Sequence, residues 1–348
     1  MVKKNILILQ NQIPYYRKAL YNGLSKYYNI TVLHSGPISI SDNDLYKEIV
    51  IKNTKISKLN FQFGMLKQIK INSYDAIIAM FDISWVYNIL ALFLKPEKTK
   101  FLWWGHGYGN NRQGNMLRNL LVKQSDGLIL YSNRFVDEFK KNGIDPNKIY
   151  IGDNTIEVEN YCFNKNIKRD TFLFVGRIQE RKGLEFLFQA FSEIIDKIPN
   201  YIKIVIVGDG DKEKEKLKLL AKKINIENRI VFKEGTIDPD LLKNYFQKAL
   251  AYVSPGHVGL GVLHSFAYGV PVVTCKNRRH APEFDNLNSS NSFICEDYSS
   301  LKSNLSKLAN NRNLSYKKGK EAYLFYKNNR TMELMVEKFK KAIENICS

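Results

Sequence analysis

Short apolar runs alternate along the chain with longer segments in which apolar and polar residues follow helical spacing. In the first half, strand-like apolar runs cover residues 5–10, 30–36, 75–81, 101–105, 127–132 and 149–154. Amphipathic segments, among them residues 15–28, lie between several of these runs. This alternation is typical of a parallel α/β sheet, because the crossover between two parallel strands is usually a helix.

The second half repeats the alternation more clearly. Strand-like runs cover residues 171–177, 202–210, 229–235, 251–254 and 271–274, and the helical segments between them cover residues 184–198, 212–224, 239–250 and 261–269. The pattern predicts a second doubly wound domain.

A polar stretch at residues 155–170 separates the two halves. We therefore predict an amino-terminal Rossmann-like domain over residues 1–160 and a carboxyl-terminal one over residues 161–325. Residues 326–348 are predicted to form a helix that crosses back to the first domain. We expect the two domains to face a cleft at the carboxyl ends of their strands, where open α/β sheets bind ligands.

Composition agrees with a two-domain α/β protein and narrows its partners. The chain has 348 residues, 44% of them hydrophobic, which exceeds the usual size of a single core. Its formal net charge of +19 favours an anionic partner. The charge is spread over both halves, whereas nucleic-acid binders usually concentrate it, so phosphate ligands or an anionic membrane surface are the better interpretations.

Neither the cysteines nor the apolar runs indicate secretion or a membrane span. The four cysteines are scattered without CxxC spacing, so neither a zinc site nor a disulfide framework is indicated, and a reducing cytosol is the simplest location. The longest uncharged apolar stretch, residues 85–94, is about half the length needed to cross a bilayer. We expect a soluble or peripheral protein.

The stretch "VGRIQERKG", residues 175–183, follows a strand and precedes a helix. Gly176 permits a close backbone turn there, and Arg177 and Lys182 lie where both cations can reach one diphosphate. A nucleotide phosphate is therefore the predicted ligand. The alternative is that both are ordinary surface cations.

The stretch "SPGHVGLGVLHSFAYGVPVV", residues 254–273, is a second candidate for phosphate binding. Its glycines allow backbone amides to approach a ligand, and the end of the following helix is positive. The alternative is a glycine-rich turn beside a buried helix and strand.

Four segments in this order, "FVGRIQERKG", "IVIVGDGDKEKEKLKLLAKK", "VFKEGTI" and "GLGVLHSFAYGVPVVT", resemble the carboxyl-terminal half of retaining GT-B glycosyltransferases of family 4. The resemblance covers roughly residues 145–285. It implies that Arg177 and Lys182 hold the donor diphosphate. It also implies contacts to the nucleotide base from Gly235, Thr236 and Ile237, and amides for phosphate and sugar from Val258, Gly259, Leu260 and Gly261.

The chain departs from this family at two glutamates separated by seven residues. The first usually faces the donor sugar and the second grips the ribose hydroxyls, and their positions here are held by Gly256 and His264. A neutral His264 offers one donor and one acceptor to a ribose hydroxyl. His257 is predicted to face the donor phosphate or sugar as a cation or a donor. The alternatives are a partly buried structural His264, a loop His257 and an inactive transferase.

The amino-terminal half offers weaker signals. "WWGHGYG", residues 103–109, ends a strand, and family members carry a histidine in this region that touches the donor sugar, so His106 is predicted to act with Arg177 and Lys182. A structural histidine in a glycine loop is the alternative. Tyr15, Tyr16 and Arg17 are predicted to meet an acceptor carbohydrate or lipid phosphate. The alternative is that the two tyrosines only open the first helix.

No metal or other cofactor is expected. The triplets at residues 42–44 and 209–211 match the metal-binding DxD of another transferase fold, but such short matches are common. Leaving-group charge is instead assigned to Arg177, Lys182, loop amides and a helix end.

Together with the resemblance, these features predict a cytoplasmic, membrane-peripheral, hexosyl-transferring enzyme that moves a sugar from a nucleotide diphosphate to a glycan hydroxyl. Retention at the anomeric carbon is implied by the resemblance alone. Front-face attack is expected, because no carboxylate nucleophile is evident. The acceptor is predicted to be a surface glycan, such as capsule or lipopolysaccharide, carried on a polyprenyl diphosphate. One alternative is a nucleotide-sugar epimerase or hydrolase on the same fold, and another is a nonenzymatic phosphate or nucleic-acid binder.

Overall fold

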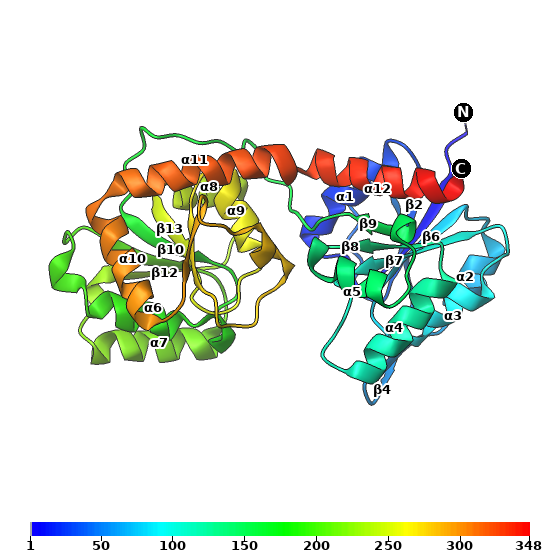
Figure 1. Cartoon of the computed structure of the whole chain (residues 1–348), viewed down its shortest axis with the longest axis horizontal. Helices are drawn as coiled ribbons and strands as arrows, with labels where there is room; N and C mark the ends of the chain where they lie inside the picture. The colour runs from blue at the N-terminus through cyan, green and yellow to red at the C-terminus, as the bar shows by residue number, and fades with distance from the viewer. Residues whose placement is uncertain (1) are drawn as a thin grey trace. The chain divides into compact units, whose positions relative to one another are not determined.

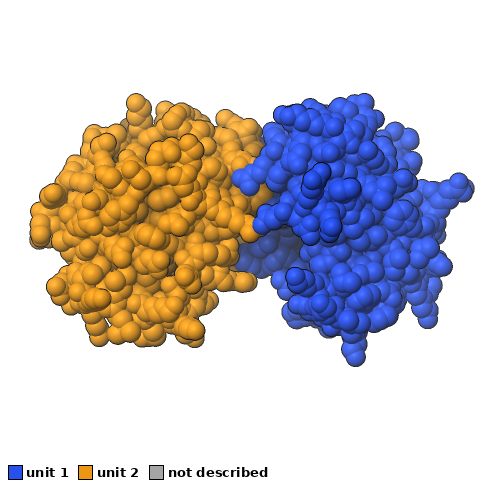
Figure 2. Space-filling view, turned by 60° about the horizontal axis from the view of Figure 1, so that its bottom comes forward, with its two compact units in different colours: residues 1–157, 332–348 blue, residues 158–331 orange. Residues whose placement is uncertain are grey.

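The computed structural model describes residues 2–348, which divide into two compact units (Figures 1 and 2). Unit 1 comprises residues 2–157 and 332–348, and unit 2 comprises residues 158–331. The chain thus leaves unit 1 three residues before the expected boundary at residue 160 and returns to it at Met332.

Unit 1 contains a parallel sheet of seven strands in the order β3-β2-β1-β6-β7-β8-β9. The strands are β1 (Asn5–Leu9), β2 (Asn29–His34), β3 (Lys47–Val50), β6 (Ala76–Met80), β7 (Lys100–Gly105), β8 (Gly127–Leu130) and β9 (Ile149–Ile151). A separate antiparallel hairpin is formed by β4 (Asn53–Ile56) and β5 (Leu59–Gln62). Because β1 pairs with both β2 and β6, the strand order reverses at β1. Ligands of open α/β sheets bind at such a reversal.

Helices cover both faces of this sheet because successive strand residues point to opposite sides. Ile6 and Ile8 pack on one face, with α1 (Lys18–Ser25) and α12 (Met332–Cys347), whereas Leu7 and Leu9 pack on the other. That second face is covered by α2 (Met65–Ile71), α3 (Val86–Leu94), α4 (Arg112–Gln124) and α5 (Val136–Lys141). Short 3-10 turns occur at η1 (Tyr15–Arg17), η2 (Asn133–Phe135) and η3 (Pro146–Lys148).

Unit 2 contains a parallel sheet of six strands in the order β12-β11-β10-β13-β14-β15. The strands are β10 (Thr171–Val175), β11 (Lys203–Val207), β12 (Ile230–Lys233), β13 (Ala249–Val253), β14 (Val272–Cys275) and β15 (Ser292–Cys295). Here the order reverses at β10, which pairs with both β11 and β13. The loops after β10 and β13 are therefore the expected ligand-binding loops of this unit.

Six helices and four 3-10 turns complete unit 2. The helices are α6 (Leu184–Ser192), α7 (Asp211–Lys223), α8 (Pro239–Gln247), α9 (Gly261–Ala267), α10 (Tyr298–Asn310) and α11 (Arg312–Asn329). The turns are η4 (Glu180–Lys182), η5 (Ile195–Lys197), η6 (Glu227–Arg229) and η7 (Pro282–Asn286). Contacts join α6 to α7 and α10, and α9 to α11.

The helix predicted over residues 326–348 is interrupted at Arg330 and Thr331, between α11 and α12. The Asn329 side chain donates to the carbonyl of Phe325, 3.0 Å away, and Arg330 Nε donates to Asn286 Oδ1, also at 3.0 Å. The first contact lies within the last turn of α11, and the second ties the end of α11 to η7 of unit 2, while the apolar face of α12 packs in the core of unit 1. The break is where the chain passes from one unit to the other. Among residues 2–348, no helix has both the length and the apolar character needed to cross a bilayer.

Candidate functional site

In unit 2, the loops after β10 and β13 meet through their backbones. The N–H of Gly256 donates to the carbonyl of Lys182 at 2.8 Å, and the N–H of His257 donates to that of Arg181 at 2.7 Å. A Cβ atom on residue 256 would lie 2.1 Å from the Arg181 carbonyl oxygen, so only glycine fits this crossing. The position where the family carries its first glutamate therefore has no room for a side chain.

Lys182 points into this crossing. Its side chain is buried and its Nζ donates to the carbonyl of His257 at 2.9 Å. Burial, followed by the positive charge of Arg181, lowers the pKa of Lys182 to about 8, while the carboxylate of Glu283 acts in the opposite direction. An anion bound beside Nζ would stabilise the charged form of a lysine that the protein itself stabilises poorly.

Arg177 lies at the carboxyl end of β10 and is exposed. Gly176, just before it, has a φ of +141° and donates its N–H to the carbonyl of Val207 at 3.0 Å. Glycine is the residue that adopts such a φ readily, so the turn predicted from "VGR" exists. The Arg177 guanidinium forms no ion pair with any of the described residues, which leaves its donors available to a ligand.

The glycine-rich turn before α9 presents backbone amides. Within the part of the chain that is described, the N–H groups of Gly259 and Leu260 donate to no protein acceptor, and a Cβ on residue 259 would meet open space. The N–H of Val258, in contrast, donates to Nδ1 of His280 at 3.3 Å. Of the four residues predicted to present amides, Gly259 and Leu260 thus have N–H groups without a protein acceptor, whereas the N–H of Val258 is bound to His280.

His280 and Glu283, which follow β14, were not among the site residues predicted from the sequence. Since Val258 is the donor to Nδ1 of His280, the neutral ring carries its proton on Nε2, 2.8 Å from the carbonyl of Cys275. The ring also stacks on Phe284 with centroids 4.2 Å apart. Glu283 is buried and acts electrostatically on Lys182. The signal for both was the segment "RHAPEFD", residues 279–285, which places a histidine and a glutamate in the loop that follows the strand predicted over residues 271–274.

The two histidines of the second stretch are neutral at neutral pH. Burial lowers the pKa of His264 to about 4, and burial followed by the charges of Lys182 and Arg181 does the same for His257. The role of His257 toward the donor stays a prediction. In the structure its carbonyl oxygen accepts hydrogen bonds from Lys182 Nζ and Ser254 Oγ. His264, on α9, has a buried Nδ1 without a protein partner and a ring 5.9 Å from that of Phe246.

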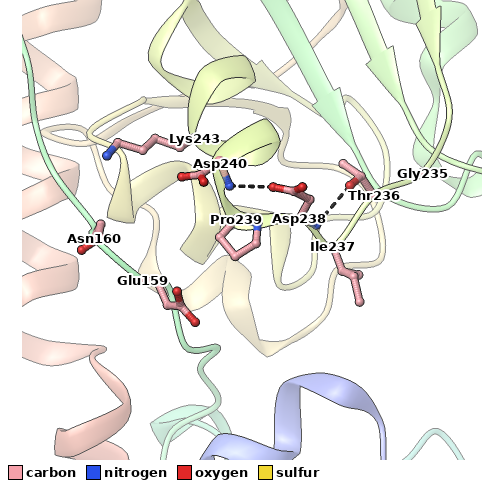
Figure 3. A pocket seen from close by; sticks show the side chains of 9 residues that line it. All are labelled: Glu159, Asn160, Gly235, Thr236, Ile237, Asp238, Pro239, Asp240 and Lys243. Atoms are coloured by element: carbon pink, nitrogen blue, oxygen red, sulfur yellow. Dashed lines mark hydrogen bonds between the residues drawn. The ribbon is translucent and has the colours of Figure 1, made fainter.

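The residues predicted to contact the base, Gly235, Thr236 and Ile237, line a pocket of about 770 Å³ (Figure 3). Its other lining residues come from the segment before β10 and from α8 with its cap, namely Glu159, Asn160, Asp238, Pro239, Asp240 and Lys243. Thr236 Oγ1 accepts from the N–H of Asp238 at 3.0 Å, and Asp238 Oδ1 accepts from the N–H of Asp240 at 2.9 Å. The pocket offers carboxylate and carbonyl acceptors to the N–H and O–H groups of a base or ribose.

Asp209 connects this pocket to the loop crossing. Its Oδ1 accepts from the N–H of Gly235 at 2.9 Å, and its carbonyl accepts from the N–H of Ile178 at 2.8 Å. Within the triplet at residues 209–211, Asp209 therefore fixes the backbone of two neighbouring loops through its hydrogen bonds with Gly235 and Ile178. In the other acidic triplet, Asp44 pairs with Lys18 at 2.8 Å. Across residues 2–348, no group of three or more histidine, cysteine or acidic side chains is arranged to hold a metal ion.

The predicted residues of unit 1 gather at the carboxyl edge of its sheet. His106 follows β7 and packs edge to face on Tyr131, with centroids 4.6 Å apart. Arg17, at the end of η1, lies over the rings of Trp104 and Tyr131, with its Cζ 4.5 and 5.3 Å from their centroids. His106 is an exposed residue, but desolvation by the groups around its ring, followed by the charges of Arg17 and Arg134, lowers the pKa of His106 to about 4.

The predicted tyrosines stand differently. Tyr15 is 56% exposed, and its ring meets that of Tyr16 edge to face at 5.6 Å. Tyr16 also faces the Arg17 guanidinium, 5.3 Å from its centroid. Both belong to the 3-10 turn that precedes α1 rather than to the helix.

Comparison with known proteins agrees with this geometry. Residues 159–325 match the family Glycosyl transferases group 1. The most similar solved structures span nearly the whole chain. They include a glycosyltransferase from Rickettsia africae, with TM-score 0.78, 16% identity and coverage of 99% of this chain and 98% of that one. The Anabaena protein Alr3699/HepE in complex with UDP aligns with TM-score 0.77 and 15% identity over 98% and 99% of the two chains.

The chain has the GT-B fold. This confirms the predicted α/β class with two Rossmann-like units, and the segment that is similar to Glycosyl transferases group 1 lies within unit 2.

Curated relatives match over shorter stretches. An uncharacterised glycosyltransferase of Methanocaldococcus jannaschii is 31% identical over 137 residues, 38% of this chain and 34% of that protein. One of Haemophilus influenzae is 26% identical over 241 residues, 64% of this chain and 62% of that protein. The chain therefore spans between one third and two thirds of the length of these relatives.

Proposed function

We propose that the chain is a retaining, hexosyl-transferring enzyme of glycosyltransferase family 4 that uses a nucleotide diphosphate donor. The observation that carries the proposal is the crossing of the loops after β10 and β13. There, Lys182 is buried beside backbone amides that have no protein acceptor, close in the chain to the exposed Arg177. The match of residues 159–325 to group 1 glycosyl transferases supports it.

In this proposal the diphosphate lies against Lys182, Arg177 and the amides of Gly259 and Leu260. The base occupies the pocket beside Thr236, which Asp209 links to the same crossing. His264, with an unpartnered Nδ1, contacts a ribose hydroxyl. These donors stabilise the departing diphosphate without a metal ion, because cations and preorganised amides already face the developing negative charge.

Retention follows from attack on the face from which the diphosphate leaves. The bond between the anomeric carbon and the β-phosphate oxygen breaks, the acceptor oxygen bonds to that carbon on the same face, and its proton passes to the departing oxygen. Gly256 holds the position of the family's sugar-facing glutamate and leaves no space for a carboxylate there. His106, neutral at neutral pH, hydrogen-bonds the transferred sugar in this scheme.

The acceptor is proposed to be a bacterial surface glycan at the cytoplasmic face of an anionic membrane. Exposed apolar residues on α4, Met116, Leu117 and Leu120, lie on a helix that also carries Arg112 and Lys123. A basic helix with exposed apolar side chains binds anionic lipid surfaces. One matching solved structure supports the glycan class, since its name is lipopolysaccharide outer core galactosyltransferase.

A nucleotide-sugar screen tests the function. The full chain is incubated with UDP, GDP, dTDP and CMP sugars, with and without chelator, and its thermal unfolding and sugar turnover are followed. We expect stabilisation by one nucleotide, indifferent to chelator, with UDP the first to try because Anabaena HepE was solved with UDP-glucose. Proton NMR of the first product formed reports the anomeric configuration.

The screen separates the proposal from its rivals. Consumption of the nucleotide sugar without any acceptor would identify a hydrolase or epimerase instead. No stabilisation by any nucleotide would overturn the donor site. An inverted anomeric product would overturn retention while leaving the transferase intact. Replacement of Lys218, which pairs with Glu215 on the surface of α7, provides a lysine control that leaves nucleotide binding unchanged.

A further inference from the structure

Arg17 lies at the place in unit 1 where an open α/β sheet binds its ligand. The strand order reverses at β1, and Arg17 ends the 3-10 turn that follows the β1 loop. Trp104, from β7, and Tyr131, just after β8, approach from the same carboxyl edge. The guanidinium therefore occupies the topological position that ligands use.

The guanidinium is buried without an anionic partner. Arg17 is only 6% exposed, yet its side chain donates no hydrogen bond and forms no ion pair with any described residue, and its Nη1 is buried without a partner. Its neighbours are the faces of Trp104, Tyr131 and Tyr16. Rings stabilise a cation, but they supply no acceptor for its N–H groups.

Arg169 in unit 2 illustrates a buried arginine with a structural role. It is 1% exposed, and its Nη1 donates to the Ser315 carbonyl at 3.3 Å and to Ser315 Oγ at 2.8 Å. Its Nη2 donates to the carbonyl of Gly269 at 2.7 Å. Burying a charged group is costly unless acceptors compensate it. Arg169 has these acceptors within the protein, whereas Arg17 lacks them.

Other groups around Arg17 reinforce its positive character. Trp104 Nε1 and the Tyr21 hydroxyl are buried donors without a protein partner. The electrostatic effects of Arg17 on Tyr21 and on His106 place both of these side chains in its neighbourhood, and Arg134 acts on His106 as well. No carboxylate contributes to the shift at His106. The neighbourhood therefore offers donors and cations to a ligand.

We propose that Arg17 binds an anionic oxygen group, a phosphate or a carboxylate, that is part of the acceptor substrate. The proposal rests on the proposed transferase function only in naming the acceptor as the molecule that carries the anion. The planar guanidinium donates two parallel hydrogen bonds to two oxygens of the anion. Trp104 Nε1 and the Tyr21 hydroxyl supply further donors.

The binding test uses inorganic phosphate with the full chain, in saturating UDP so that the donor site is filled. We expect phosphate to raise the unfolding temperature of the wild type above that in sodium chloride of equal ionic strength, and Arg17→Gln to abolish this rise while keeping the rise caused by UDP. An equal phosphate effect in wild type and Arg17→Gln overturns the proposal, as does the absence of any effect in the wild type. A failure of UDP to stabilise concerns the proposed function alone, and the phosphate arm is then run without UDP.

Kinetics distinguish the source of the anion. With a phosphorylated acceptor, Arg17→Gln is expected to raise the acceptor KM about tenfold to a hundredfold, with little change for the dephosphorylated acceptor or for the donor. A rise in the donor KM alone would assign the anion to the donor and overturn the acceptor assignment. If Arg17→Gln does not fold, the same measurement is made on Trp104→Phe, which leaves an aromatic ring at this position and removes the Nε1 donor. It is expected to weaken phosphate binding severalfold, and unchanged binding would count against the proposal.

Discussion

In unit 2, backbone hydrogen bonds join the loop after β10 to the loop after β13, whereas in unit 1 aromatic rings surround the turn after β1. Lys182 satisfies one of its hydrogens on the His257 carbonyl, and Arg17 satisfies none within the described chain. Both cations lie at a reversal of strand order. The comparison shows that the same topological position is built from backbone in one unit and from side-chain packing in the other.

The substitution expected to disrupt the crossing of the loops after β10 and β13 most strongly is one that gives residue 256 a side chain. Gly256→Glu restores the glutamate of the family pattern, but its Cβ would lie 2.1 Å from the Arg181 carbonyl oxygen. We expect a loss of at least about 3 kcal/mol of stability and no nucleotide binding, as measured by denaturant unfolding and calorimetry. Gly259→Ala is the matched control for the stability measurement alone, because no protein atom lies within 4 Å of a Cβ at that position. Wild-type stability in Gly256→Glu would contradict the tight crossing.

Removal of the buried cation is expected to have the next largest effect. Lys182→Ala should weaken nucleotide diphosphate binding by about 2 kcal/mol, because a charged hydrogen-bond donor is lost from a site shielded from water. Arg177→Ala should cost less, since Arg177 is exposed. Titration calorimetry with UDP measures both. Unchanged affinity in both variants would remove these cations from the donor site.

The pH dependence sharpens the role of Lys182. Its pKa is about 8 in the folded chain and near 10.5 when unfolded, so between these values the unfolded state holds more protons. The contribution of Lys182 to stability therefore rises with pH across this window. Nucleotide affinity should instead fall above pH 8, because the ligand needs the charged form. In the wild type we expect stability and nucleotide affinity to change in opposite directions as the pH rises through this window, and both changes to be lost in Lys182→Ala. Changes in the same direction would contradict this role of Lys182.

The smallest expected effect is at His264. His264→Ala should weaken nucleotide binding about fivefold through loss of one hydrogen bond to ribose, and His264→Gln should retain most of the affinity. The comparison to make is UDP against its 2′,3′-dideoxy analogue, because only the hydroxyl-bearing nucleotide should respond to the substitution. A lowered unfolding temperature with unchanged affinity for UDP would assign His264 to packing alone.

The sequence predicts the parts of the molecule that depend on local pattern. Alternating strands and helices predict the two parallel sheets, and the carboxyl edge of a parallel sheet collects the loops that follow its strands. That the loops carrying Lys182 and Gly256 lie at the carboxyl edge of one sheet therefore follows from the pattern, whereas the hydrogen bonds between their backbones were not predicted. The strands β3 and β15 were missed because they are short and mix polar with apolar residues.

The rest depends on contacts between distant residues. His280 positions Val258 only because the segment after β14 folds back to the glycine turn, and no local pattern encodes that return. The burial of Arg17 under Trp104 joins residues far apart in the chain. The resemblance singled out Arg17 for the acceptor, but its lack of an internal partner is visible only in three dimensions.

The most direct test of the central claim is a crystal structure of the full chain bound to UDP. We expect the diphosphate oxygens within about 3 Å of Lys182 Nζ and of the Gly259 and Leu260 amides, with uracil in the pocket beside Thr236. A diphosphate bound away from the crossing of the loops after β10 and β13 would contradict it.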